Sequence, residues 1–243
     1  MYDIVIIGGG IVGLATGVKI LQSRPDLKIA ILEKEKELAK HQTANNSGVI
    51  HSGLYYKPGS LKAINCINGY HELIQFCKEE DIPFEITGKV VVATREDQLH
   101  ILETLLERGI QNGLKGTRKI SLEELKDYEP HCVGIGAIHV PQTGIVDYLK
   151  VALAYGQKII KTGGDIYTGH KVLKISQNDS LNFIESSKSS FKAKLVINCA
   201  GLHSDKVACL GDQSIDDVKI IPFRGEYYKI KKEREYLVKN LIY

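Results

Sequence analysis

IVIIGGGIVG, at residues 4–13, is the stretch that decides the fold of this sequence. Its first four residues form a short apolar run, which is typical of a strand buried on both faces of a parallel sheet. Gly8, Gly10 and Gly13 then follow at the spacing G-x-G-x-x-G, and apolar residues recur at helical spacing beyond them. A second apolar run ends on Glu33, 20 residues after the last glycine of the motif. Together these features predict a Rossmann-type βαβ unit that binds a dinucleotide.

Each part of this motif has a physical role. We expect Gly8 to permit a tight turn, Gly10 to let the backbone approach a pyrophosphate, and Gly13 to let helix and strand pack closely. The helix N-terminus offers unpaired N–H groups and a positive dipole end to the phosphates. Glu33 can accept both ribose hydroxyls and would repel a 2′-phosphate, which disfavours NADP. The motif alone does not distinguish an FAD-binding site from an NAD-binding site. The alternative to a nucleotide-binding role is a βαβ unit that binds no nucleotide.

The composition excludes several classes of protein. The chain has 243 residues, 43% hydrophobic and 25% charged, which is ordinary for a globular protein of one or two domains. A formal charge of +3 is too small to indicate nucleic acid as a partner. Five cysteines without a C-x-x-C spacing indicate reduced thiols in a cytosol, and no group of residues has the spacing of a metal site. The uncharged run 4–18 is too short and glycine-rich for a membrane span. We therefore expect a cytoplasmic protein, at most peripheral to the inner face of the membrane.

The rest of the chain indicates two domains. A polar, turn-rich loop at 34–59 has little to bury, and loops of this length inside a domain are usually functional. A last pair of strands is expected between Val218 and Ile230. The predicted fold class is α/β, with a Rossmann-like domain and an inserted α+β domain built on a mixed or antiparallel sheet. The boundaries assign the nucleotide-binding domain to 1–80 and 144–212, and the inserted substrate domain to 81–143 and 213–243.

Several motifs carry a resemblance to a known family. Besides the opening fingerprint they are HQTANNSGVIHSGLYYKPGSLK at 41–62, NCAG at 198–201 and PFRGEYY at 222–228. Together they resemble the flavin oxidoreductases of the D-amino-acid oxidase and glycerol-3-phosphate dehydrogenase type. Within that family, the motif at 41–62 and VPQTGIVDY at 140–148 look like the L-2-hydroxyglutarate oxidase/dehydrogenase subgroup. Members of that family are longer than 243 residues, so we expect a C-terminally truncated substrate domain.

The resemblance implies that the cofactor is FAD. It also implies oxidation of L-2-hydroxyglutarate to 2-oxoglutarate by hydride transfer to FAD, with oxygen or a membrane quinone as electron acceptor. The alternatives are another small substrate, such as glycerol 3-phosphate or an amino acid, and an inactive flavin-binding fragment. The residues implied for the cofactor site are Gly8, Gly10, Gly13, Glu33, Gln42, Thr43, Ser47, Gly48, Val49, Val172, Ala200 and Gly201, and for Val172 a plain core position is the alternative.

His51 is the candidate catalytic base. Oxidation of a 2-hydroxy acid needs a base for the hydroxyl proton, and a histidine near its ordinary pKa accepts a proton at neutral pH. The residue follows the loop that the resemblance puts against the flavin ring. The alternative is a loop histidine that makes a structural hydrogen bond. His139 and His203 are interpreted as structural, and His41 as a loop stabiliser or a neighbour of the cofactor.

Arg224, Tyr55 and Tyr228 are the candidate substrate-binding residues. An arginine binds a carboxylate through two parallel hydrogen bonds, and tyrosine hydroxyls suit a second carboxylate. The alternatives for Arg224 are a surface salt bridge or support of the flavin. The alternative for the tyrosines is core packing, since tyrosine is common in strands.

Overall fold

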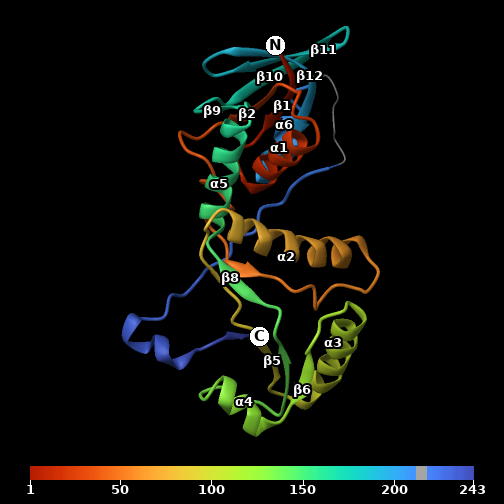
Figure 1. Ribbon diagram of the computed structural model, residues 1–243, viewed down its shortest axis with the longest axis vertical. Coiled ribbons are helices and arrows are strands. Elements are labelled where there is room, and N and C mark those ends of the chain that lie inside the picture. Colours follow the sequence, from red (N-terminus) through yellow and green to blue (C-terminus); the bar gives the residue numbers. More distant parts are fainter. Residues whose placement is uncertain (212–217) are drawn as a thin grey trace. The chain divides into compact units, whose positions relative to one another are not determined.

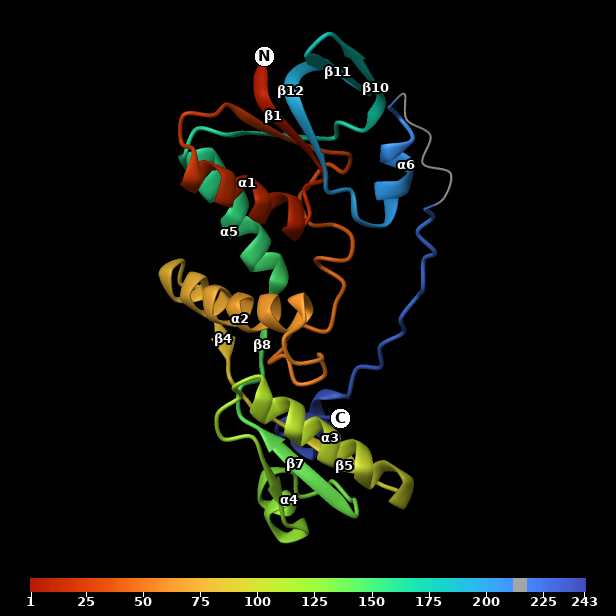
Figure 2. The ribbon, with the colours of Figure 1, turned by 90° about the vertical axis from the view of Figure 1, so that its right-hand side faces the viewer.

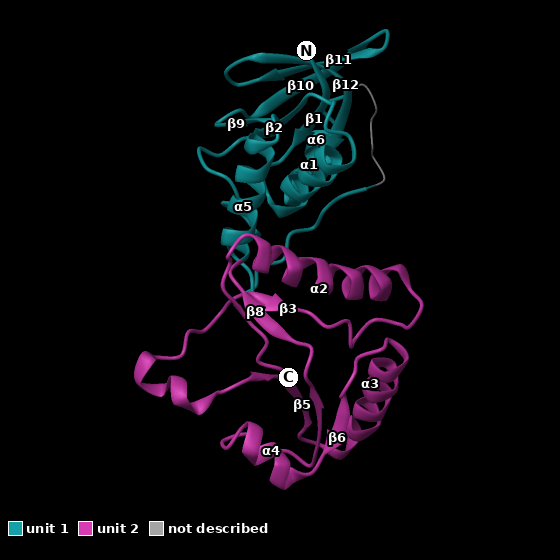
Figure 3. Cartoon of the chain, viewed as in Figure 1, with its two compact units in different colours: residues 1–47, 148–225 teal, residues 48–147, 226–243 magenta. Residues whose placement is uncertain are grey.

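The computed structural model describes residues 1–211 and 218–243. These residues form two compact units, which Figure 3 shows in different colours. Unit 1 comprises residues 1–47 and 148–225, and unit 2 comprises residues 48–147 and 226–243. The chain passes from unit 1 into unit 2, returns to unit 1 and ends in unit 2, so residues 48–147 form an insertion in unit 1. Each unit has its own β-sheet structure and core, and the elements of both are labelled in Figure 1.

Unit 1 is built on one six-stranded sheet with the order β10-β11-β12-β1-β2-β9. The pairs β12–β1, β1–β2 and β2–β9 are parallel, whereas β10, β11 and β12 form an antiparallel meander. The strands are β1 (Tyr2–Ile7), β2 (Ile29–Glu33), β9 (Asp165–Thr168), β10 (Val172–Asn178), β11 (Leu181–Ser186) and β12 (Ser190–Asn198). This arrangement confirms the predicted α/β class.

Alternate residues of β1 and β2 are buried on opposite faces of this sheet. Ile4 and Ile6 pack with α1 (Ile11–Ser23) and α5 (Tyr148–Lys161), which lie side by side in Figure 2. Val5 and Ile7 pack on the other face with residues of β10 to β12 and with α6 (Ser204–Ala208). Burial on both faces explains why the opening run is apolar without alternation.

Two glycines of the fingerprint are required by the backbone itself. Gly8 has φ +117, and a Cβ there would lie 2.3 Å from the carbonyl oxygen of Cys199. A Cβ on Gly13 would lie 2.1 Å from the carbonyl oxygen of Gly8. The turn after β1 is thus pressed between α1 and the end of β12, and side chains at these two positions would push the elements apart.

Unit 2 contains a four-stranded sheet and a three-stranded sheet. In the first, β13-β5-β7-β6, the β5–β7 and β6–β7 pairs are antiparallel and β13–β5 is parallel, so the sheet is mixed, as predicted. The second has the order β3-β8-β4 and is antiparallel. The strands are β3 (Val49–Ile50), β4 (Phe84–Glu85), β5 (Lys89–Ala93), β6 (Arg118–Ile120), β7 (Gly136–Val140), β8 (Gly144–Val146) and β13 (Leu241–Ile242).

Helices cover both faces of the mixed sheet. Leu102 and Leu105 of α3 (Leu99–Gln111) pack with Val91 on one face, and Leu125 of α4 (Leu122–Tyr128) packs with Val90 on the other. The unit also contains α2 (Leu61–Glu79), whose N-terminus the Ser60 side chain caps, and the 3-10 helices η1 (Glu96–Gln98) and η3 (Lys232–Leu237).

The structure differs from the sequence-based assignment in three stretches of the domain division and in one expected pair of strands. Residues 48–80, with α2, and residues 144–147 belong to unit 2, while 218–225 belong to unit 1. The reason is pairing, since β8 of the stretch 144–147 pairs with both β3 and β4. The predicted boundary between 212 and 213 lies outside the described residues. The strand pair expected from Val218 to Ile230 is wrong, because that segment is irregular and pairs with no described strand.

Candidate functional site

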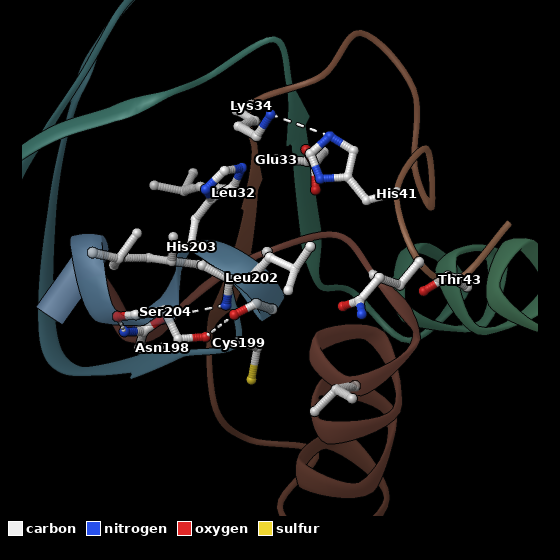
Figure 4. A pocket seen from close by; sticks show the side chains of 18 of the residues that line it. Leu32, Glu33, Lys34, His41, Thr43, Asn198, Cys199, Leu202, His203 and Ser204 are labelled. Atoms are coloured by element: carbon white, nitrogen blue, oxygen red, sulfur yellow. Dashed lines mark hydrogen bonds between the residues drawn. The ribbon is translucent and has the colours of Figure 1, made fainter. Parts of the chain in front are cut away.

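A cavity of about 950 Å³ lies within unit 1 at the carboxyl ends of β1, β2 and β12. Its wall includes Gly8 after β1, Glu33 at the end of β2 and Asn198 at the end of β12 (Figure 4). Ligands of open α/β sheets bind at this edge, outside the carboxyl ends of the strands. The volume is at the upper end of the range for small-molecule sites.

The N-terminus of α1 opens onto this cavity at Gly10 and Ile11. Gly10 is the N-cap residue and supplies no side-chain cap, and the first turn of α1 carries no acidic residue. The Ile11 N–H donates a hydrogen bond of 3.0 Å to Oγ1 of Thr43. The positive end of the helix is therefore not neutralised by a carboxylate of its own first turn, and this geometry suits a phosphate group.

The carboxylate of Glu33 accepts two backbone hydrogen bonds. Its Oε2 accepts from the Gly9 N–H at 2.7 Å, and its Oε1 accepts from the Glu35 N–H at 2.8 Å. An ionised carboxylate has about four lone-pair sites, so each oxygen can accept one more bond. Glu33 also lines the cavity, and it therefore remains able to receive hydroxyl groups of a ligand.

Lys34, His41 and His203 line the same cavity, and Glu35 contacts two of them; of these residues the sequence indicated only His41 as a possible neighbour of the cofactor. Nε2 of His41 lies 3.0 Å from Oε1 of Glu35 and 3.2 Å from Nζ of Lys34, and the His41 ring meets the His203 ring edge to face at 5.9 Å. Hydrogen bonds from Lys34 and His41 lower the pKa of the Glu35 carboxyl. His203 thus lines the cavity rather than a remote part of the core.

The far wall of the cavity combines apolar and backbone groups. Val172 is 8% exposed, belongs to the core beneath β1 and β2, and also lines the cavity. Asn198 Oδ1 accepts from the Ala200 N–H at 3.2 Å, and its Nδ2 donates to the Ser204 carbonyl at 2.7 Å. These bonds fix the turn after β12, where Gly201 has φ +57. A ligand can approach this turn closely because Ala200 and Gly201 have little or no side chain.

The structure brings most of the predicted cofactor residues together. Gly13 lies behind the turn and does not line the cavity, and neither does Ser47. Gly48 and Val49 belong to unit 2. The predicted residues that line the cavity are Gly8, Gly10, Glu33, Gln42, Thr43, Val172, Ala200 and Gly201.

His51 lies in unit 2, directly after β3. Its carbonyl accepts a hydrogen bond of 3.4 Å from the Cys66 thiol. His51 is exposed, but partial desolvation still lowers the pKa of its imidazole, and the charge of Lys89 lowers it further. The neutral ring, which can accept a proton, is therefore favoured at neutral pH.

Lys89 is the functional candidate that sequence reasoning missed. It is 1% exposed, and its Nζ lies 4.4 Å from the centre of the Tyr55 ring and 4.8 Å from that of Tyr243. The one signal in the sequence is a lysine at the head of the apolar strand KVVVA. Of the three predicted substrate residues, Tyr55 contacts this lysine, whereas Arg224 and Tyr228 lie exposed in the irregular segment.

Metal sites and membrane spans are both absent from residues 1–211 and 218–243. No group of three or more His, Cys, Asp or Glu side chains in these ranges could hold a metal ion. None of the helices in the same ranges is long and apolar enough to cross a membrane.

Comparisons with known proteins address the family and the fold. The L-2-hydroxyglutarate dehydrogenase of Indibacter alkaliphilus is 67% identical over 242 residues, and the mitochondrial L-2-hydroxyglutarate dehydrogenase of Homo sapiens is 44% identical over 254 residues. Both alignments cover 100% of this chain, but only 61% and 55% of those proteins, so the chain spans little more than half the length of these relatives.

Solved structures have the same architecture. L-alpha-glycerophosphate oxidase from Mycoplasma pneumoniae, with FAD bound, matches with a TM-score of 0.80 at 28% identity, over 86% of this chain and 56% of that one. L-proline dehydrogenase from P. horikoshii matches with a TM-score of 0.81 at 16% identity, over 99% of this chain and 63% of that one. This match supports the fold alone.

The family described as FAD dependent oxidoreductase matches residues 3–243. This match confirms the resemblance drawn from the motifs, and it confirms FAD, rather than NAD, as the cofactor of the family. The chain belongs to the FAD dependent oxidoreductase family.

Proposed function

We propose that this chain is part of a flavoenzyme that oxidises L-2-hydroxyglutarate to 2-oxoglutarate. The observation that carries the proposal is the cavity of unit 1, in which a helix N-terminus without an acidic residue in its first turn and the Glu33 carboxylate flank one space. That pair of features suits the phosphates and the ribose of an ADP-containing dinucleotide. The substrate is inferred from the identity of 67% to a protein named L-2-hydroxyglutarate dehydrogenase.

The residues of unit 1 would hold the cofactor. The N–H groups at the start of α1 bind the pyrophosphate, with Gly10 leaving room for it, and Glu33 accepts the ribose hydroxyls. Gln42, Thr43, Ala200 and Gly201 line the rest of the path, and Val172 closes it with an apolar surface, in keeping with its place in the cavity wall. The roles predicted for Ser47, Gly48 and Val49 remain predictions.

His51 would accept the proton of the substrate's C2 hydroxyl. When bound, FAD supplies the two-electron acceptor for the hydride that leaves C2. Removal of the proton and the hydride together converts the secondary alcohol to a ketone, so the base must be unprotonated before the reaction starts. The lowered pKa of His51 supports this role. Arg224, Tyr55 and Tyr228 are proposed to contact the substrate carboxylates.

The same proposal includes an electron acceptor for the reduced flavin and a location in the cell. Oxygen or a membrane quinone would reoxidise the flavin, and the protein would work in the cytoplasm, with at most peripheral contact with the membrane.

Anaerobic reduction of the flavin tests the substrate. L-2-hydroxyglutarate should bleach the flavin absorbance of the holoprotein, whereas D-2-hydroxyglutarate, the matched control of identical charge, should not. Bleaching by glycerol 3-phosphate or by an amino acid instead would move the substrate to another class. Flavin that no substrate reduces, but dithionite does, would indicate a flavin-binding protein without this activity.

A further inference from the structure

Lys89 points into the apolar side of unit 2. It opens β5, where it is aligned with Val140 of β7 and with Leu241 of β13. Alternate residues of a strand share a face, so Lys89 lies on the same face as Val91. Val91 belongs to the core cluster that contains Leu54 and the buried leucines of α3. The strand therefore directs a cationic side chain toward a surface that is otherwise apolar.

The ammonium group of Lys89 has aromatic neighbours and no carboxylate. Its Nζ lies over the rings of Tyr55 and Tyr243, whose centres are 6.2 Å apart. Within residues 1–211 and 218–243, no acidic side chain forms an ion pair or a hydrogen bond with it. Burial lowers the pKa of Lys89 to about 8. Lysine is almost never fully buried unless it is paired, so this position calls for an anion from outside the described chain.

The surroundings of Lys89 would admit such an anion. Tyr55 is 39% exposed, so the buried ammonium lies against a side chain that faces solvent. Desolvation lowers the pKa of His51 and raises the pKa of the Cys66 thiol. The charge of Lys89 lowers both pKa values, so both groups lie within its electrostatic field. The Lys89 ammonium is thus in contact with the rings of Tyr55 and Tyr243, and in the same unit the Cys66 thiol donates to the backbone carbonyl of His51.

We propose that Lys89 binds a carboxylate of the substrate, with the hydroxyls of Tyr55 and Tyr243 beside it, and so holds a 2-hydroxy acid next to His51. This proposal rests on the proposed function for the identity of the substrate. It adds Lys89 to the residues proposed to contact the substrate carboxylates, next to Tyr55. A buried ammonium suits this task, because a charge-assisted hydrogen bond gains strength when water is excluded.

The test uses Lys89→Met, which keeps the length of the side chain and removes its charge. The probe is glutarate, a dicarboxylate that cannot be oxidised at C2, titrated into the holoprotein by calorimetry. Lys89→Met should weaken glutarate binding about tenfold to 100-fold, the worth of a charge-assisted hydrogen bond. Lys57→Met, which removes an exposed lysine of the same unit, is the matched control and should bind as wild type does. Glutarate binding by Lys89→Met with wild-type affinity, or no binding by the wild-type protein, would overturn the proposal.

The pH dependence in the wild-type protein tests the same proposal without a variant. Glutarate affinity should fall as the pH rises through about 8, where Lys89 loses its proton. The groups that face Lys89 are His51, Tyr55, Cys66 and Tyr243. The pKa of His51 is lowered, that of Tyr55 is raised to about 12 and that of the Cys66 thiol is raised, so these three do not produce a fall at pH 8. An affinity that stays constant from about pH 7 to 10 contradicts the role of Lys89, because the buried ammonium should lose its proton within that range.

The two proposals fail in different ways. If L-2-hydroxyglutarate does not reduce the flavin but glutarate binding depends on Lys89, the substrate assignment fails and the carboxylate site stands. If the substrate reduces the flavin in Lys89→Met with an unchanged KM, the carboxylate site fails and the proposed function stands. A melting temperature measured for each variant separates loss of binding from loss of folding.

Discussion

The backbone N–H of Gly9 donates a hydrogen bond of 2.7 Å to Oε2 of Glu33. The acid at the end of β2 therefore holds the glycine-rich turn after β1, in addition to facing the cavity. The sequence predicts only the second role, because the motif places the acid by its distance from the glycines. The first role follows from the parallel pairing of β1 and β2, which brings the two strand ends together.

Glu33→Ala should weaken FAD binding by about 1.5–3 kcal/mol, because the charge-assisted bonds to the ribose are lost. The melting temperature should also fall, since the Gly9 and Glu35 N–H groups lose their acceptor. Glu33→Gln keeps the shape and one carbonyl oxygen, so its effect on stability should be smaller. FAD affinity is measured by fluorescence titration of the apoprotein, with the exposed Glu185→Gln as the matched control. An unchanged affinity in Glu33→Ala would mean that the acid does not contact the ribose.

Gly10→Val should abolish flavin binding while the protein stays folded. Added methyl groups would occupy the space at the N-terminus of α1 where the pyrophosphate is proposed to bind, and a Cβ there meets only Oγ1 of Thr43, at 3.3 Å. Gly13→Ala should instead unfold unit 1, because its Cβ would lie 2.1 Å from the Gly8 carbonyl oxygen. Circular dichroism and flavin absorbance of the purified variants separate these outcomes. Gly69→Ala, with open space around its Cβ, is the control. A yellow Gly10→Val protein would contradict the assignment of the cavity.

The sequence predicts the parts of unit 1 whose cause is local. Continuous apolar runs specify β1 and β2, and glycine is the only residue type that the backbone contacts of Gly8 and Gly13 permit. Which strands pair with each other is not determined by local sequence. The assignment of α2 to unit 2 depends on strands that are far apart in the sequence, and the motif at 222–228 forms no strand because no described strand lies along it.

One physical reason explains why the sequence did not identify His203 and Lys89 as site residues. His203 reaches the cavity because the turn after β12 places it against His41, and Lys89 is buried because its strand is aligned with both β7 and β13. A lone histidine after a strand and a lysine at the start of one are both common on protein surfaces. Only the tertiary arrangement distinguishes these two side chains from exposed ones.

Glu129 anchors the segment that leads into β13. Its carboxylate is buried, with 0% exposure, and accepts hydrogen bonds from the backbone N–H groups of Lys239 and Asn240. Glu129→Ala should lower the free energy of unfolding by about 1–3 kcal/mol, because two part-buried backbone N–H groups lose a charged acceptor. Denaturant unfolding measures the loss, and Glu107→Ala, at an exposed position of α3, should lie close to wild type. Equal stability of the two variants would show that the segment is held by its strand pairing instead.

His51→Ala should slow the anaerobic reduction of the flavin by L-2-hydroxyglutarate by about 100-fold or more, the usual worth of a general base. The flavin spectrum and the amount of bound FAD should not change, because His51 is not among the residues that line the cavity of unit 1. Stopped-flow absorbance measures the rate. A normal rate would remove His51 from catalysis, and loss of flavin would make it a ligand of the cofactor.

The pH dependence of the same rate links His51 to Lys89. Protonation of the imidazole blocks proton transfer, so the rate should fall as the pH drops through the pKa of His51. Burial and the charge of Lys89 hold that pKa below its ordinary value of 6.5, so the fall should lie below pH 6.5 in the wild-type protein. Lys89→Met removes the second cause, and the midpoint in the pH profile of kcat/KM, which reports the free enzyme, should therefore move upward, toward 6.5. If Lys89→Met leaves the midpoint unchanged, the two side chains are not coupled. The midpoint is the informative quantity, because a merely structural effect of the substitution would change the maximal rate and not the pH at which the rate falls to half.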